Sequence, residues 1–223
     1  MNITYIHHSC FLVETDRNYF IFDYFKGDIP NLNTNKPIYV FSSHCHDDYY
    51  NKEIFDLLKK MGMTSIKAVL SDDIEEEKTI DTVLVCPNNE YNLDFNLKCT
   101  TFKSTDLGVA FLIEDDGKLI YHAGDLNDWV WDDESDDYNQ QMTIDYRNEI
   151  NRLKETLNNR EIDVAFVVLD PRQEKDYAKG MLYYLENIPS KMVYPMHYWN
   201  EPSIIEKFLN EYPQYKHQIY KTE

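Results

Sequence analysis

Residues 41–49 read FSSHCHDDY, and this stretch decides the fold that the sequence predicts. It continues a short apolar run that is typical of a buried β-strand, so its polar side chains leave the strand end on a rigid edge. Imidazole nitrogens and carboxylate oxygens suit borderline divalent ions such as zinc. The alternate spacing of His44, His46 and Asp48 lets ligands on one turn point at a common centre. The stretch therefore predicts a metal-binding loop, with a plain polar turn as the alternative.

The same pattern, an apolar strand that ends in metal-type residues, occurs in three further segments. Residues 119–125 read LIYHAGD and end in a carboxylate after an Ala-Gly pair, which permits close backbone approach. Residues 192–197 read MVYPMH, and the strand at 98–103 runs into a Ser-Thr-Asp sequence. If these strands share one sheet direction, all four loops meet at one edge. The further candidate ligands at these strand ends are Asp106, Asp125 and His197.

Short β-type runs dominate the first two-thirds of the chain, and amphipathic helical patterns follow between later strands. The predicted strands cover residues 3–6, 11–14, 19–23, 38–41, 68–70, 82–86, 97–102, 109–114, 118–121, 162–169 and 192–194. The predicted helices cover residues 52–61, 143–157, 175–187 and 202–211. The acidic residues 132–137 read as a solvated loop, with a calcium loop as the alternative. This order predicts a single domain, residues 1–223, of sheets with helices on their outer faces.

At this point the residues resemble the metallo-β-lactamase superfamily. Its first signature, H-x-H-x-D-H, is similar to HCHDDY at residues 44–49. The stretches HSCFLVE at 8–14 and YHAGD at 121–125 resemble segments of its small lactonase-like and phospholipase-like hydrolases. Together these segments, in the right order, cover essentially the whole chain. The resemblance implies an α/β (α+β) fold, the four-layer αββα sandwich, which agrees with the order of strands first and helices later.

Carried over residue by residue, the resemblance implies ligands for two metal ions. His44 and His46 would bind the first ion, Asp125 would bridge both ions, and the second ion would take Asp48 and His197. Asp48 would also orient or deprotonate the nucleophile. The cofactor expected is thus one or two divalent ions, zinc first.

Two positions depart from the family pattern. Tyr49 stands where the signature has its last histidine, and a phenol is a poorer ligand than an imidazole unless a metal deprotonates it. Asp106 stands near where a third histidine of the first site is expected. More oxygen ligands favour manganese or iron as alternatives to zinc, and the second site could be weak or empty. Tyr49 is also a candidate donor to a developing oxyanion, which makes it a catalytic candidate beside Asp48.

Four further residues are candidates for substrate contact or for orienting ligands. His8 falls near the pocket rim by resemblance, and a plain structural role is the alternative. His122 precedes Asp125 and could orient it. Asp170 follows a buried strand and could support a ligand, while Arg172 beside it could meet an anionic substrate, a plain turn being the alternative. The aromatic residues near the candidate metal loops could line a pocket or pack in the core; they are Trp129, Trp131, Tyr198 and Trp199.

Charge and composition restrict the partners. Lys and Arg number 22 against 40 Asp and Glu, a formal net charge of −18. This field repels phosphate backbones and anionic headgroups, so nucleic acid and membrane surfaces are not expected partners. Four cysteines without a C-x-x-C pair suggest a reducing compartment, and the N-terminus shows no leader pattern, so we expect a cytoplasmic protein. The oligomeric state stays open.

The function expected from these residues is hydrolysis of a small-molecule ester, lactone or phosphodiester by a metal-activated water. The alternative is a metal-binding but catalytically silent member of the family, a sensor or scaffold, because Tyr49 and Asp106 remove imidazoles from both sites. A sulfur-transfer or redox relative within the same fold ranks last, because no cysteine or cofactor segment supports it.

Overall fold

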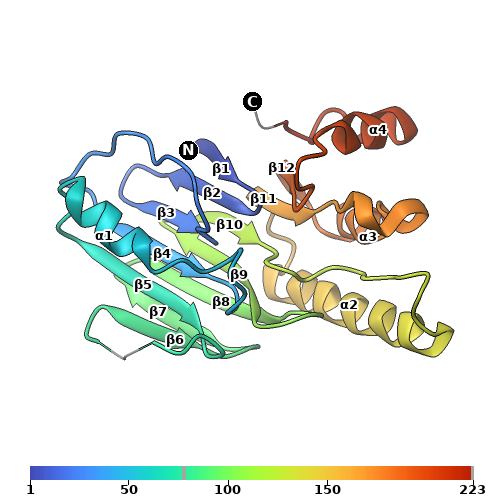
Figure 1. Ribbon diagram of the computed structural model, residues 1–223, viewed down its shortest axis with the longest axis horizontal. Helices are drawn as coiled ribbons and strands as arrows, with labels where there is room; N and C mark the ends of the chain where they lie inside the picture. The colour runs from blue at the N-terminus through green and yellow to red at the C-terminus, as the bar shows by residue number, and fades with distance from the viewer. Residues whose placement is uncertain (77–78, 222–223) are drawn as a thin grey trace. The chain divides into compact units, whose positions relative to one another are not determined.

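The computed structural model describes residues 1–76 and 79–221, and these residues form two compact units. The N-terminal unit covers Met1–Cys86, and the C-terminal unit covers Pro87–Lys221. Each unit is built on one six-stranded sheet that mixes parallel and antiparallel pairs (Figure 1). In both sheets the strands lie side by side in chain order.

The N-terminal sheet has the order β1-β2-β3-β4-β5-β6. Its first three strands pair antiparallel, and β3 to β6 pair parallel. The helix α1 lies between β4 and β5 in the chain, as a parallel crossover requires. The elements are β1 (Asn2–His7), β2 (Cys10–Glu14), β3 (Tyr19–Phe22), β4 (Ile38–Ser42), α1 (Glu53–Lys60), β5 (Ile66–Ser71) and β6 (Thr82–Val85).

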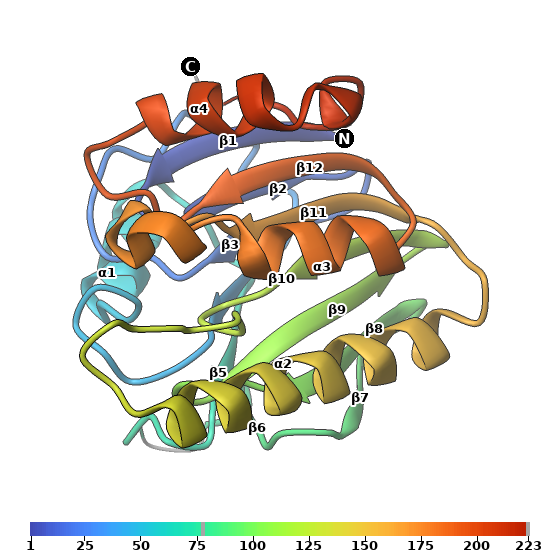
Figure 2. The ribbon, with the colours of Figure 1, turned by 90° about the vertical axis from the view of Figure 1, so that its right-hand side faces the viewer.

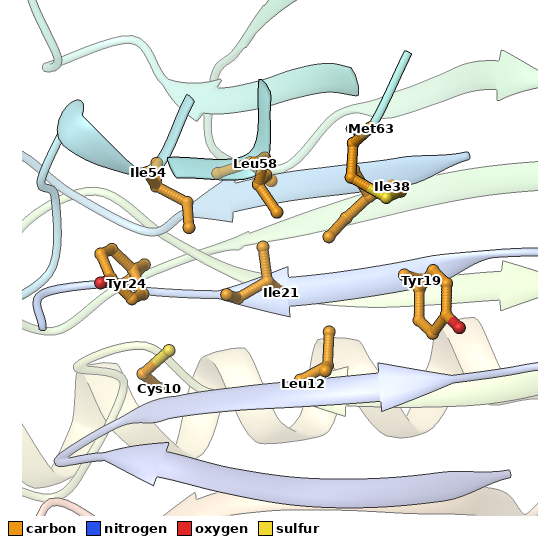
Figure 3. Packing of buried hydrophobic residues seen from close by; sticks show 10 residues of the cluster. Cys10, Leu12, Tyr19, Ile21, Tyr24, Ile38, Ile54, Leu58 and Met63 are labelled. Atoms are coloured by element: carbon orange, nitrogen blue, oxygen red, sulfur yellow. The ribbon is translucent and has the colours of Figure 1, made fainter. Parts of the chain in front are cut away.

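One face of this sheet carries its own apolar core under α1. Ile54 and Leu58 stand one helical turn apart, so both project from the same side of α1. Figure 3 shows them directed at Ile21 of β3, with Leu12 of β2 in the same layer. These residues are buried, and their removal from water holds α1 on the sheet.

The C-terminal sheet has the order β12-β11-β10-β9-β8-β7. Strands β7 to β10 pair antiparallel, and β10, β11 and β12 pair parallel. Its elements are β7 (Glu90–Asp94), β8 (Leu97–Lys103), β9 (Val109–Asp115), β10 (Lys118–His122), α2 (Asp136–Leu157), β11 (Ile162–Val168), α3 (Lys179–Asn187), β12 (Ser190–Met196) and α4 (Ser203–Glu211), with short 3₁₀ turns at Pro171–Asp176 and Pro213–Tyr215.

Helices α2 and α3 lie next to each other along the C-terminal sheet, α2 by β8 and α3 by β11 (Figure 2). The side of α2 that carries Tyr146, Ile150 and Leu153 is buried, as the helical period predicts. Under α3, the rings of Tyr184 and Tyr121 stack at 5.6 Å. In the described part of the chain, no helix combines the length and apolar character needed to span a membrane.

Strand direction decides where the polar strand ends lie. In the N-terminal sheet, β1, β3 and β4 point the same way, so His8, Asp23 and His44 follow strand ends on one edge. In the C-terminal sheet, β8, β10, β11 and β12 share a direction, so their carboxyl ends also meet on one edge. The carboxyl edge is where ligands bind in such sheets.

Several expected elements differ from the structure. The four strands with metal-type ends do not share one sheet, because β4 belongs to the N-terminal sheet and the other three to the C-terminal one. Strand β7 was not expected. Helix α2 begins at Asp136, inside the acidic run expected to be a loop, because the Ser135 hydroxyl accepts the Tyr138 N–H and caps it. Helix α3 begins at Lys179, after a 3₁₀ turn, and not at Lys175.

Candidate metal centre

Two groups of candidate ligands stand at the two carboxyl edges. We call the first the N-terminal ligand group, and it consists of His8, His44, His46, Asp48 and Tyr49. We call the second the C-terminal ligand group, and it consists of Asp106, Asp125, Asp170 and His197. Each group lies within one unit.

His44 and His46 stay close together after β4. Their ring centroids are 4.6 Å apart, and one nitrogen of each lies within 4.8 Å of the other. The His44 side chain is fully buried, whereas His46 is exposed. The H-x-H spacing therefore brings two imidazoles to one place at the strand end, as the alternation of residues predicts.

A buried chain of hydrogen bonds orients His44. The Ser43 hydroxyl lies 2.9 Å from an oxygen of Asp23 and 3.0 Å from Nδ1 of His44. A hydroxyl has one proton, and it donates this proton to the carboxylate, so it accepts from the imidazole. Nδ1 of His44 then carries the proton, and Nε2 keeps its lone pair for a metal. The Ser43 N–H also donates to Asp23, at 2.6 Å.

Tyr49 packs against the same imidazole. Its ring centroid lies 4.0 Å from that of His44, and its side chain is 1% exposed. Its hydroxyl lies 3.2 Å from the Ser9 hydroxyl. Asp48 is half-buried, and one of its oxygens lies 3.5 Å from Nε2 of His8.

In the C-terminal ligand group, Asp125 and His197 are buried and in contact. Oδ1 of Asp125 lies 3.4 Å from Nε2 of His197. Two ligand atoms at about 2.0–2.1 Å from a tetrahedral zinc ion are about 3.3 Å apart. The pair therefore has the separation of two ligands on one ion.

Asp170 fixes the orientation of His197. Oδ2 of Asp170 lies 2.9 Å from Nδ1 of His197, and the guanidinium of Arg172 donates to both oxygens of this fully buried carboxylate. Burial alone raises the pKa of Asp170, but the hydrogen bonds from His197 and Arg172 outweigh it and lower that pKa to about 2. The ionised carboxylate accepts a hydrogen bond from the protonated Nδ1, so Nε2 of His197 is left as the ligand atom. His197 itself has φ +65°, a conformation that non-glycine residues seldom adopt.

The loop that carries Asp125 is held from several sides. Nε1 of Trp129 donates to the Asp125 carbonyl at 2.8 Å, and the Thr105 hydroxyl donates to the Asn127 carbonyl at 2.6 Å. His122 is buried and accepts the Gly124 N–H on Nδ1 at 3.1 Å, so it braces the turn before Asp125. The sequence predicts that His122 could orient Asp125. In the structure the contact of His122 is with the backbone N–H of Gly124, next to Asp125.

A cavity of about 250 Å³ opens beside the C-terminal ligand group. Asp106 is exposed and lines it, together with Asp125 and His197. Arg172 lies at its wall, 5.0 Å from the Trp199 ring and 5.9 Å from the Trp131 ring. The remaining lining residues are Thr105, Trp129, Trp131, Tyr138 and Met142, whereas Tyr198 is buried away from solvent.

Three contributors to the site were missed from the sequence: Asp23, Ser43 and the Gly180 contact. Asp23 was read as the last residue of a strand, and Ser43 as part of the polar run before His44. The available signal was the carboxylate at the end of β3, next to β4 in the same sheet. Gly180 touches the Asp125 loop from α3, where a Cβ atom would meet the Asn127 side chain at 1.9 Å.

A family model described as "Beta-lactamase superfamily domain" matches residues 2–145, which is more than half of the chain. The chain belongs to the metallo-β-lactamase superfamily. The metallo-β-lactamase match includes the N-terminal ligand group and Asp125, while His197 lies beyond it. No curated protein sequence matches the chain.

Solved structures of this superfamily fold cover nearly the whole chain. Igni18, a metallo hydrolase from Ignicoccus hospitalis, matches with a TM-score of 0.64 and 15% identity over 99% of this chain and 94% of its own. CmlA, a diiron β-hydroxylase from Streptomyces venezuelae, gives 0.61 and 10% over 99% of this chain and 52% of its own. Zinc-bound PqqB from Methylobacterium extorquens gives 0.53 and 13% over 96% and 83%. These likenesses confirm the expected α/β metallo-β-lactamase fold class.

Proposed function

We propose that the chain is a metal-dependent hydrolase that binds one or two divalent ions through residues of these ligand groups. The observation that carries this proposal is the way hydrogen bonds orient the His44 and His197 imidazoles. Both imidazoles are buried, and both are held through Nδ1 by a network that ends on a buried carboxylate. Such support of a ligand imidazole is typical of metal sites and leaves Nε2 of each as the ligand atom.

The ligand assignment follows the family pattern and is part of the proposal. His44, His46 and Asp106 would hold the first ion, Asp125 would bridge, and Asp48 and His197 would hold the second. Nitrogen and oxygen donors suit zinc first, with manganese or iron as alternatives, and metallo-β-lactamase relatives carry zinc in PqqB and two irons in CmlA.

A bound divalent ion supplies a water of lowered pKa and polarises the scissile carbonyl or phosphoryl oxygen. The chain's own residues supply geometry. Asp48, which is half-buried and has one oxygen 3.5 Å from Nε2 of His8, would take up the proton of the attacking water. Tyr49 would donate to the oxyanion through its hydroxyl. In the structure this hydroxyl is hydrogen-bonded to the Ser9 hydroxyl.

The proposed substrate is a small-molecule ester, lactone or phosphodiester. The cavity beside Asp125 has the size of a small organic group, and its walls combine Trp129 and Trp131 with the cation of Arg172. The net charge of −18 favours small molecules over nucleic acid and membrane surfaces. A cytoplasmic location and the lactonase-like subgroup stay predictions.

Metal removal tests the hydrolase proposal. The protein is purified without added metal, its metal content is measured by mass spectrometry, and it is assayed on lactone, ester and phosphodiester panels before and after chelation. We expect activity that disappears with the metal and returns on adding zinc, manganese or iron. Activity that survives complete chelation would rule out this function.

A second candidate, a catalytically silent metal-binding member, is favoured by one observation. Tyr49 and Asp106 stand where the family signature has imidazoles. The change Tyr49→His separates the two candidates. If this variant hydrolyses a panel substrate that the parent leaves intact, the native protein is the silent member.

A further inference from the structure

His8 occupies a strained turn at the carboxyl edge of the N-terminal sheet. Strands β1 and β2 are joined by two residues, His8 and Ser9, between the paired His7 and Cys10. Two-residue hairpins favour turns that need a positive φ, and His8 has φ +56°. Its N–H donates to the Tyr5 hydroxyl at 2.9 Å, which holds the turn. The side chain is 2% exposed, so the chain buries an imidazole at a backbone conformation that non-glycine residues seldom adopt.

The buried imidazole is directed at a candidate ligand. Nε2 of His8 lies 3.5 Å from Oδ2 of Asp48. This separation is close to the 3.4 Å between Nε2 of His197 and Oδ1 of Asp125, and to the edge of about 3.3 Å in a tetrahedral zinc site. His8 and Asp48 therefore have the spacing of two donors on one ion.

Tyr49 explains why an imidazole is needed from elsewhere. It takes the position of the last histidine in the family signature. Its hydroxyl, however, is hydrogen-bonded to the hydroxyl of Ser9, which follows His8 in the same turn. Its ring packs against two imidazoles, with its centroid 5.6 Å from that of His8 and 4.0 Å from that of His44. The phenol thus fills space and anchors the turn that presents His8.

We propose that His8 is a metal ligand that holds the second ion together with Asp48, in place of the imidazole missing at position 49. This inference rests on the proposed function, since it assumes that the ligand groups bind metal. His8 lies outside the family signature. With His8 as a ligand, the second ion has the imidazole that position 49 does not supply.

The test is metal binding by His8→Asn. Asparagine adopts positive φ more readily than most residues, so the turn is kept. The control is His7→Asn, which changes the adjacent, half-buried histidine whose ring lies by Phe25. Cobalt and zinc per chain are measured by mass spectrometry after dialysis, and affinities by calorimetry, with thermal melts to confirm folding. We expect two ions in the parent and in His7→Asn, and one ion in His8→Asn.

In His8→Asn, the affinity for the second ion should fall by more than roughly 10- to 100-fold, which is the usual loss when a residue that only orients a ligand is changed. The double variant His8→Asn with Tyr49→His should recover affinity, because an imidazole returns to the signature position. His8→Asn that binds two ions as tightly as the parent would overturn the assignment and leave the hydrolase proposal standing, and so would a parent that binds only one ion. A parent that binds no metal would overturn both.

Discussion

Nδ1 of His197 lies 2.9 Å from Oδ2 of Asp170, and this contact ties a candidate ligand to a fully buried carboxylate. Arg172 completes the arrangement by donating to both oxygens of Asp170. The imidazole is thereby fixed in one tautomer and one orientation before any ion arrives. A side chain that is fixed in this way loses little conformational entropy on binding.

The first prediction concerns this contact. Asp170→Asn replaces the charged acceptor by an amide of the same size and should weaken metal affinity by about 10- to 100-fold. Calorimetric titration with zinc or cobalt measures the change. Asp132→Asn, at an exposed acidic position of the same unit, is the control and should leave affinity unchanged. Equal affinities for Asp170→Asn and the parent would show that Asp170 does not support a ligand.

The second prediction concerns Asp23 and folding stability. Asp23→Ala removes the acceptor of the buried Ser43 N–H and hydroxyl. Leaving buried donors without an acceptor costs about 1–3 kcal/mol each, so the free energy of unfolding should fall by at least about 2 kcal/mol. Urea denaturation measures it, with the exposed Asp16→Ala as control. An unchanged midpoint would contradict the assigned network.

Gly180 gives the third prediction. A Cβ atom at this position of α3 would lie 3.1 Å from the Asp128 backbone nitrogen and far inside contact distance of Asn127. Asn127 is itself held by Gln173 at 2.8 Å, so it cannot move away freely. Gly180→Ala should destabilise the fold by about 1–3 kcal/mol, as overpacking does, although alanine favours helices. Glu186→Ala, exposed on the same helix, should be neutral in the same thermal melt.

A fourth prediction sets the pH dependence of one ion pair. Lys36 donates to Glu14 at 2.7 Å, and this hydrogen bond is the main reason why the pKa of Glu14 is lowered to about 2. A carboxyl with a depressed pKa stabilises the fold above its unfolded pKa of about 4.3 and loses this effect as the pH falls to about 2. Lys36→Met should cost about 0.5–1 kcal/mol at pH 7, and the difference from the parent should shrink below pH 4.

For this ion pair, denaturant unfolding between pH 2 and pH 7 provides the measurement, and the exposed Lys52→Met is the control. Lys36 also donates to the Thr15 carbonyl at 2.8 Å, so a residual difference should remain at low pH. A difference that stays constant from pH 7 to pH 2 would contradict the role of the charge.

Tyr49→Phe is the fifth prediction. If the phenol donates to the oxyanion, this variant should lose about 100-fold or more in kcat while metal content stays unchanged. If the hydroxyl serves mainly to hold Ser9, activity should stay and the free energy of unfolding should fall by about 1 kcal/mol. Steady-state kinetics and denaturation on the same preparation separate the two roles.

The strand ends with ligands could be predicted because each shows a local signal, an apolar run followed by His or Asp. The division of the strands between two sheets could not be predicted, because no local signal marks where one sheet ends: β4 and β10 read alike in sequence but belong to different sheets. Strand β7 was not predicted, because Glu90–Asp94 has no apolar run and is partly exposed at a sheet edge. The Asp23–Ser43 contact joins residues 20 positions apart, and the carboxylate after β3 is its one local signal, which does not identify Ser43 as the partner.

The chain-order arrangement of both sheets has a consequence for folding. Within each sheet, every strand after the first pairs with the one made immediately before it, so strand pairing in the N-terminal sheet is complete at Val85, before β7 begins at Glu90. Short sequence separation between partners speeds folding, and domains tend to fold from the N-terminus during synthesis. A growing chain can therefore assemble His8, Asp23 and His44 at their edge while Asp125 and His197 are still untranslated. The protein would then leave the ribosome with its N-terminal ligand group already formed.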